Sequence, residues 1–297
     1  MVFYQSKLRN WIDINKLNCE YLNSNPNAIQ FLKENPDKIN WTLLSQNPNA
    51  IEILKANINK IDWNYLNFNP NGIQVLKDYP DKINWSYLSA NPNAIEILKT
   101  NIDKIDWNNL SFNSNAIELL KKNPNKINWN HLSYNENAIE LLKENQDKID
   151  WDNLSFNENA IELLKENPNK IDWKHLSKNV NTIELLKENP NKINWYNLSF
   201  NENAIELLKE NPDKINWNNL SYNSNAVKLL KDNQDKIEWI YFSLNTAIFT
   251  YDYEFIKETN KGLNEEIIIK ALHPKRMLRL METYGEDEIY KNYFEDD

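Results

Sequence analysis

The sequence predicts an all-α fold, an α-solenoid of eleven 22-residue units with helical end caps. Tryptophan recurs every 22 residues without a change of register, at Trp41, Trp63, Trp85, Trp107, Trp129, Trp151, Trp173, Trp195, Trp217 and Trp239. Cys19 fills the tryptophan slot of an earlier unit, and the last unit is degraded. Apolar residues within each unit follow helical spacing. A fixed period of this length is typical of solenoids, whose units contact mainly their neighbours.

Residues 1–18 precede the first unit, and we expect them to form an N-terminal cap. Their tryptophan, Trp11, lies outside the 22-residue register. The terminal units of a solenoid need a non-repeating cover that keeps their apolar end face from water.

The repeat array spans residues 19–246, and each unit is predicted to hold a longer α-helix and a short helix. In the unit that starts at Trp151, Asn157 is expected to cap the longer helix, and Asn159 stands three residues before Glu162 as in a capping box. Residues 160–164 then carry a buried helical face.

The longer helix is expected to end at Asn167, before Pro168 and an extended link. Asp172 is then predicted to cap one turn of α- or 3-10 helix that contains Trp173. A rival interpretation makes Lys-Ile-Asp-Trp a short strand, which gives a leucine-rich-repeat horseshoe. In the helical interpretation, layers about 8–10 Å apart make an elongated array of roughly 100 Å.

Residues 247–297 are expected to form a helical C-terminal cap, because the period decays after Trp239. Asn264 precedes one helical segment, and His273 with Pro274 precedes another.

Composition excludes several classes of protein. The net charge is −9, so no global basic field attracts nucleic acid or an anionic membrane. A single cysteine excludes an internal disulfide framework. We find neither a signal peptide nor an apolar run of membrane-spanning length, so we expect a soluble, intracellular protein.

The repeated motif I-[DN]-W-x-x-L-S-x-N-x-N-A-I-E-L-L-K-x-N-P-[DN]-K and the stretch from Ala247 to Arg276 resemble tandem-repeat proteins of giant amoeba-infecting DNA viruses of the mimivirus type. The resemblance covers nearly the whole chain and implies expression in an infected host cell, in the host cytoplasm or the virion. It supplies no catalytic residues. The spacing of the unit is also similar to that of the leucine-rich repeat variant, an α/3-10 solenoid, which bears on architecture alone.

The positions that the repeat leaves free are the candidate binding site. Residues two and five after each tryptophan lie three apart, so they are expected to line one stripe along the solenoid. This candidate partner-binding stripe consists of Tyr65, Phe68, Tyr87, Phe112, His131, Tyr134, Phe156, His175, Lys178, Phe200 and Tyr222. The stripe either binds a protein or completes the packing between short helices. A second candidate is a basic contact for an acidic partner or a phosphate, formed by Lys270, His273, Lys275, Arg276 and Arg279.

Catalytic and metal chemistry find no support in the sequence. No Cys/His cluster has zinc spacing, and three glycines cannot build a phosphate loop. The repeated tryptophans are interpreted as a structural core ladder, and the asparagines from Asn25 to Asn245 as helix caps that also bond between layers. We therefore predict a non-enzymatic, cofactor-free, monomeric scaffold for a protein partner. A self-assembling component of the virion or viral factory and an RNA-binding repeat protein are the alternatives.

Overall fold

The chain folds as two compact units, one of residues Leu8–Thr250 and one that combines residues 1–7 with residues 251–297. The computed structural model describes residues 6–251, 257, 276, 277 and 279–281. Most of the predicted C-terminal cap therefore lies outside the described residues. Its first two residues end a 3-10 turn (Thr246–Ile248). Phe249–Tyr251, where helix was expected, is a strand, β2, that pairs with β1 (Ser6–Leu8).

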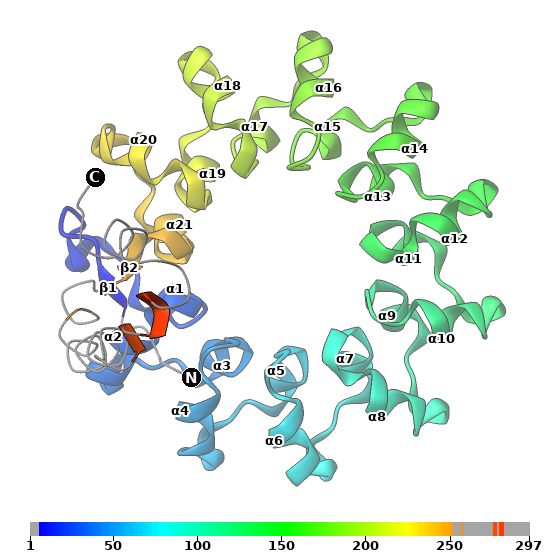
Figure 1. The fold of residues 1–297 in the computed structure, drawn as a ribbon, viewed down its shortest axis with the longest axis horizontal. Helices are drawn as coiled ribbons and strands as arrows, with labels where there is room; N and C mark the ends of the chain where they lie inside the picture. The colour runs from blue at the N-terminus through cyan, green and yellow to red at the C-terminus, as the bar shows by residue number, and fades with distance from the viewer. Residues whose placement is uncertain (1–5, 252–256, 258–275, 278, 282–297) are drawn as a thin grey trace. The chain divides into compact units, whose positions relative to one another are not determined.

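Residues Leu8–Thr250 form a ring with two concentric rows of short helices (Figure 1). The all-α solenoid of eleven units is confirmed. The inner row consists of α1 (Cys19–Leu22), α3 (Trp41–Gln46), α5 (Trp63–Phe68), α7 (Trp85–Ala90), α9 (Trp107–Phe112), α11 (Trp129–Tyr134), α13 (Trp151–Phe156), α15 (Trp173–Leu176), α17 (Trp195–Leu198), α19 (Trp217–Tyr222) and α21 (Trp239–Leu244). The outer row consists of α2 (Ile29–Glu34), α4 (Ile51–Lys55), α6 (Ile73–Asp78), α8 (Ile95–Lys99), α10 (Ile117–Lys121), α12 (Ile139–Lys143), α14 (Ile161–Glu166), α16 (Ile183–Glu188), α18 (Ile205–Glu210) and α20 (Val227–Lys231).

The two helices of a unit differ less in length than predicted. Both α13 and α14 have six residues, and α14 begins only at Ile161. The expected capping box is absent, because the N-cap residue of α14 is Ala160 and no side chain caps this helix. The Asn159 Nδ2 donates to the Glu136 carbonyl of the preceding unit (3.1 Å). The Asp172 cap is confirmed, since its Oδ1 accepts from the His175 N–H.

The expected extended link contains a 3-10 turn, as Pro168–Lys170 shows. A turn of this kind follows every outer helix and brings the chain back to the inner row. Since β1 and β2 are the only strands in the described part of the chain, the horseshoe interpretation is wrong. No helix among the described residues is long and apolar enough to span a membrane.

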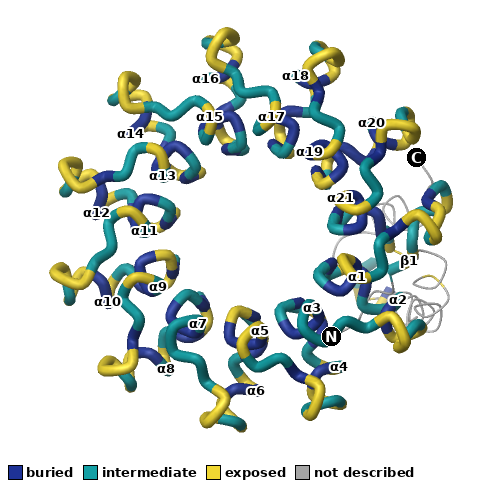
Figure 2. Tube along the Cα trace, turned by 180° about the vertical axis from the view of Figure 1, so that it is seen from behind, coloured by how far each residue is buried: buried dark blue, intermediate teal, exposed yellow. Residues whose placement is uncertain are grey.

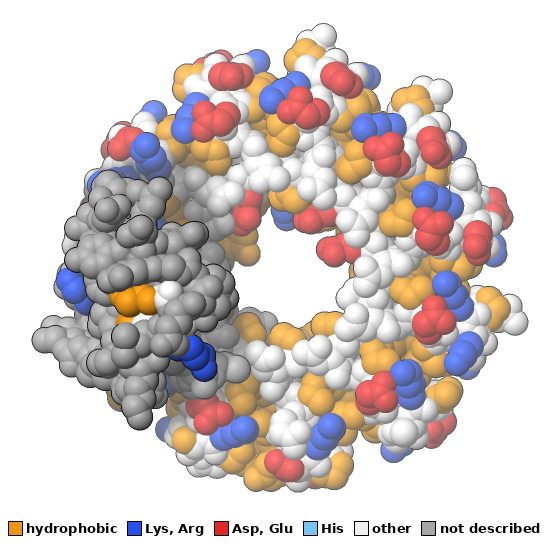
Figure 3. All heavy atoms as spheres, in the orientation of Figure 1, with side chains coloured by type: hydrophobic (Ala, Val, Ile, Leu, Met, Phe, Trp, Pro, Cys, Tyr) orange, Lys and Arg blue, Asp and Glu red, His pale blue; other side chains and the backbone are white. Residues whose placement is uncertain are grey.

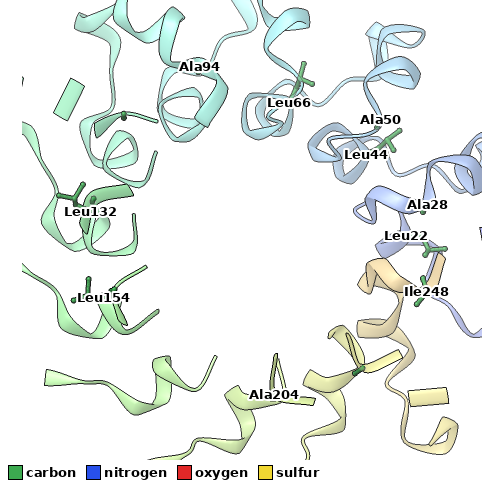
Figure 4. Packing of buried hydrophobic residues seen from close by; sticks show 14 of the residues in the cluster. Leu22, Ala28, Leu44, Ala50, Leu66, Ala94, Leu132, Leu154, Ala204 and Ile248 are labelled. Atoms are coloured by element: carbon green, nitrogen blue, oxygen red, sulfur yellow. The ribbon is translucent and has the colours of Figure 1, made fainter. Parts of the chain in front are cut away.

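The core lies between the two rows. Leu154, Ala160 and Leu164 are fully buried, and equivalent residues repeat around the ring (Figures 2 and 4). The tryptophans pack against this core but are only partly buried. A lysine from the following 3-10 turn covers the exposed side of several of them, as when Lys60 Nζ lies 4.7 Å from the Trp41 ring centre. The tryptophan ladder is thus the edge of the core, held by cation–π contacts.

A ladder of buried asparagines joins each unit to the one before it. Asn113 Oδ1 accepts from the Asn115 N–H and so caps the start of the outer segment. Its Nδ2 donates to the carbonyls of Ser89 and Asn91 in the preceding unit (3.1 and 2.7 Å). Both predicted roles of this asparagine, cap and bond between layers, are confirmed.

The ladder continues from the last unit to the first and closes the ring. Asn25 Nδ2 donates to the carbonyls of Ser243 and Asn245 at 3.1 and 3.0 Å, which are the same bonds that Asn113 makes. Helix α1 packs against α21, and Ile248 lies beside Leu22 and Ala28 (Figure 4). The expected elongated array with two covered ends is therefore wrong. We call this junction the seam.

Residues 9–17 complete the last unit, whereas the sequence predicted a cap on the first. Helix α21 is followed by β2 where the other units have an outer helix, and the N-terminal segment supplies the 3-10 turn Ile14–Lys16. Lys16 Nζ lies 5.0 Å from the Trp239 ring centre, which repeats the lysine–tryptophan contact. The Arg9 Nε donates to the Ala247 carbonyl (2.7 Å). Both ends of the array therefore build one composite unit.

Candidate functional site

The candidate site is the wall of the central opening. The inner helices border this opening, which remains open when all side chains are drawn (Figures 1 and 3). The residues three and four after each tryptophan slot, such as Leu110 and Ser111, are buried toward the core. The other side of each inner helix is formed by the residues one, two and five after that slot. We call these the wall positions.

Exposed apolar surface of the ring concentrates at the wall positions. Ten large apolar side chains are exposed in the described part of the chain, and eight of them occupy wall positions. They are Tyr21, Tyr65, Phe68, Phe112, Tyr196, Tyr222, Ile240 and Tyr241. A contiguous exposed apolar surface rimmed by polar groups is typical of a binding site.

The predicted stripe lies on this wall, and neighbouring members touch. Phe112 stacks on His131 with ring centres 4.0 Å apart and lies 5.8 Å from Tyr134. Tyr134 is in turn 5.9 Å from Phe156. The side chain of Phe112 is nevertheless 40% exposed. The aromatic side chain of Phe112 thus packs between units, as one interpretation of the stripe predicted, and is still exposed; binding of a protein there stays a prediction.

One member of the stripe is a lysine held between two rings. Lys178 Nζ lies 5.1 Å from the Phe156 ring centre and 4.8 Å from that of Phe200. At these distances an ammonium group is attracted to the ring faces. The wall therefore already holds one cation between two of its own aromatic side chains.

Four exposed wall residues were missed by the sequence analysis. Tyr196 and Ile240 follow the tryptophan by one residue, a slot that holds a polar or charged residue in every other unit and was not part of the predicted stripe. Tyr21 and Tyr241 lie in the first and last units, which diverge most from the repeat. In a closed ring the exposed sides of the inner helices face one another across the opening. An exposed apolar side chain on any inner helix then becomes a candidate, and this criterion is available only once the closure is known.

Amides at the wall also bond between units. The Nδ2 atoms of Asn109 and Asn197 donate to the backbone carbonyls of Ser86 and Lys174. His131 occupies the same position, and its Nδ1 lies 2.9 Å from the Asn108 carbonyl oxygen. His175 Nδ1 instead faces Asp172 Oδ1 at 3.3 Å. The two histidines therefore act in separate, local contacts.

Metal binding finds no support in residues 6–251 or in the few described beyond them. No group of three or more His, Cys, Asp and Glu side chains there could hold a metal ion. Of the predicted basic contact, Arg276 and Arg279 are exposed on a helical segment. Lys270, His273 and Lys275 lie outside the described residues.

Comparison of the chain with protein-family models, curated proteins and solved structures gives no significant match. The resemblance to giant-virus repeat proteins therefore stays a prediction.

Proposed function

We propose that this protein is a non-enzymatic, ring-shaped binding protein that holds a polypeptide segment of a partner in its central opening. The observation that carries the proposal is the concentration of exposed aromatic and aliphatic side chains at the wall positions. Tyrosine is among the residues that contribute most binding energy at protein interfaces, and phenylalanine is enriched there.

The size of the opening suits a single polypeptide segment. Eleven inner helices spaced about 9 Å apart make a circle of about 100 Å, which is about 30 Å across between helix axes. Subtracting the radius of a helix with its side chains on each side leaves about 20 Å. An α-helix with side chains is about 10–12 Å wide, so one helix or one extended chain fits.

Closure of the ring favours this role over self-assembly. A structural filament of repeats needs exposed end faces that stack on other copies. In residues 8–250 the two ends of the array pack against each other through the repeat's own bonds, so neither end face is open to a second copy. A monomeric ring that binds a partner is the function this geometry supports best.

The test is site-specific photo-crosslinking in a host-cell lysate, with benzoylphenylalanine placed at Tyr222 or Phe112 of the wall. Matched controls carry it at Lys122 or Glu144, which are exposed in the outer row. We expect a stoichiometric polypeptide adduct from the wall sites alone. Adducts from the outer sites alone, or none from the wall, would contradict the proposal.

The same measurement is repeated on a variant with substitutions Phe112→Gln, Tyr196→Asn and Tyr222→Gln. Each new residue occurs naturally at the same slot of another unit, as Gln46 and Asn218 show, so the ring is expected to keep its fold. Loss of the partner in this variant, with unchanged circular dichroism and unfolding, assigns binding to the wall.

A further inference from the structure

A pocket lies beside the seam, between α20 and the N-terminal segment that completes the last unit. It has a volume of about 660 Å³, within the range of roughly 300–1,000 Å³ that is typical of sites for small molecules. Its lining includes Arg9, Trp11, Val227, Lys228, Lys231 and Ala247, all of them in the ring. We call this the seam pocket.

The seam pocket forms where small residues replace larger ones of the repeat. Ala247 occupies a slot that holds asparagine in the ten preceding units, as in Asn225, whose Nδ2 donates to the Glu202 carbonyl of the unit before (3.0 Å). Val227 begins its outer helix, whereas the other nine outer helices begin with isoleucine. Both side chains are smaller than those they replace, so less of the space between the units is filled.

The charge of α20 also departs from the repeat. Lys228 stands where seven outer helices have a glutamate, and each of these glutamates pairs with the lysine three residues later, as Glu206 does with Lys209 (2.7 Å). In α20 that later residue is Lys231, so two like charges share one helix face and repel each other. Neither lysine forms an ion pair within the described part of the chain.

Arg9 brings a third cation to the pocket from its other side. The Arg9 Nε donates to the Ala247 carbonyl (2.7 Å), which holds the guanidinium at the pocket, while the Nη atoms make no hydrogen bond to any residue that the structure describes. Among the described residues, the one carboxylate bonded to a lining side chain is Glu202, which accepts from the Ser224 hydroxyl (2.7 Å). Three cations therefore line the seam pocket, and one carboxylate borders it.

We infer that the seam pocket binds a small polyphosphate, a compound in which two or more phosphate groups are linked. The phosphate oxygens accept charge-assisted hydrogen bonds from Arg9, Lys228 and Lys231, and the guanidinium matches the geometry of a phosphate. Several negative charges close together also relieve the repulsion between the two lysines. Trp11 lines the same pocket and offers an aromatic surface to a base, so the polyphosphate is either an inorganic chain or part of a nucleotide.

The ligand is expected to hold the ring closed. Arg9 belongs to the N-terminal segment, whereas Lys228 and Lys231 belong to α20, so a polyphosphate bound to all three joins the two sides of the pocket. A ligand that binds only one form of a protein stabilises that form. This inference does not depend on the proposed function, because no wall position of the opening lines the seam pocket.

The test is isothermal titration calorimetry with four probes: sodium tripolyphosphate, ATP, sulfate and a glutamate peptide. The protein is compared with Lys228→Glu, which restores the glutamate of the repeat and its pairing with Lys231. The matched control is Lys122→Glu, which changes the net charge equally at an exposed outer position where the next unit has Glu144. A second variant, Ala247→Asn, restores the amide of the repeat and fills the pocket without a change of charge. Each new residue occurs at the same slot of other units, so the fold is kept.

We expect tripolyphosphate and ATP to bind, about tenfold more weakly to Lys228→Glu and to Ala247→Asn, and with unchanged affinity to Lys122→Glu. Tighter binding of ATP than of tripolyphosphate identifies a nucleotide, whereas equal or weaker binding of ATP identifies the phosphate chain alone. Failure of both compounds to bind overturns the inference. So does equally tight binding of sulfate or the glutamate peptide, or equal weakening by Lys228→Glu and Lys122→Glu.

Hydrogen-exchange mass spectrometry with tripolyphosphate locates the site. Exchange is expected to slow in α20 and in residues 9–17 and to stay unchanged in α9 and α11. Protection confined to other units, or spread evenly over the ring, overturns the inference. Failure of the photo-crosslinking experiment leaves it standing, because no polypeptide partner is involved.

Discussion

At the scale of single residues, one buried asparagine per unit carries out two tasks. It caps the outer segment of its own unit and donates two hydrogen bonds to the preceding unit, eleven times around the ring. The side chain is almost fully buried at each site. Removing it therefore leaves one buried carbonyl, such as that of Ser89, and one N–H group without partners, which costs more than the loss of an exposed bond.

We expect Asn113→Ala to lower the free energy of unfolding by about 2–4 kcal/mol, because each unsatisfied buried group costs about 1–3 kcal/mol. The matched control is Asn115→Ala, which removes a bond to the Pro92 carbonyl at an exposed side chain. That control is expected to cost less than about 1 kcal/mol. Urea unfolding followed by tryptophan fluorescence measures both, and equal effects would contradict the ladder's role.

A row of glutamates makes stability depend on pH. Although Glu158 is exposed, partial desolvation raises the pKa of its carboxyl above the ordinary 4.5, and repulsion from Glu136 and Glu202 raises it further. A raised folded-state pKa means that the folded state favours the protonated carboxyl. The protonated Glu158 carboxyl therefore stabilises the folded state below its ordinary pKa. This stabilisation is lost as the pH rises through the folded-state pKa.

Glu158→Gln is therefore expected to raise the melting temperature at pH 7, by a stabilisation of less than about 1 kcal/mol. The gain is expected to vanish below pH 4, where the carboxyl is protonated in both states. Glu162→Gln serves as the control, because its carboxylate pairs with Lys165 at 3.0 Å and its loss brings no gain. A gain that persists at low pH would show that charge is not the cause.

At the scale of elements, the periodicity predicted where helices lie better than how long they are. In the unit that starts at Trp151, the buried Leu154 and the buried residues after Asn157 indicated where the two helices lie. Their lengths could not be read from the periodicity, because α14 begins only at Ile161 and the Asn159 side chain bonds to the preceding unit in place of its own helix. A substitution within the repeat keeps its bond in the structure: Asn67 replaces the usual serine and still donates to the Trp63 carbonyl (2.7 Å).

The seam is the one interface whose elements differ from all others. Strand β2 and residues 9–17 stand where an outer helix and its turn belong. Trp11 packs against Phe242 with ring centres 5.7 Å apart, and Arg9 holds the Ala247 carbonyl. These contacts join segments more than 200 residues apart, so the seam is expected to open before the rest of the ring.

We expect Arg9→Ala/Trp11→Ala to speed hydrogen exchange in α1 and α21 and to leave α9 and α11 unchanged, because each unit contacts mainly its neighbours. Hydrogen-exchange mass spectrometry measures this, with Asn115→Ala as the control at an interface far from the seam. Faster exchange spread evenly over all units would show that the ring opens as a whole.

At the scale of the whole molecule, closure was the property that the sequence did not predict. Composition and period define the unit, but the path of a solenoid follows from a small rotation between neighbours. This rotation depends on how the serine, leucine and asparagine side chains of the inner row pack relative to the outer row, and no periodicity reports it. The residues of the predicted stripe lie at wall positions of the inner helices, and the enclosed wall that they line appears only in the ring.

Closure also depends on the number of units. Eleven units require a rotation of about 33° each, whereas ten require about 36°. The inner and outer rows lie about 10 Å apart. The additional rotation of about 3° per unit therefore shifts neighbouring outer helices by about 0.6 Å relative to each other. Close-packed interiors resist such shifts. A ten-unit ring would have this strain at every interface, and the contacts of a single seam would have to offset all of it.

Deletion of residues 107–128, one whole unit, is therefore expected to leave the ring open. Small-angle X-ray scattering should show a larger radius of gyration despite the shorter chain. The matched control replaces the same residues with a copy of residues 151–172, which changes the sequence but keeps eleven units, and its radius is expected to match that of the natural chain. A compact ten-unit ring whose seam exchanges hydrogen as slowly as that of the natural chain would show that the interfaces bend freely. Closure at eleven units would then reflect the termini that complete the last unit, and not the geometry of the repeat.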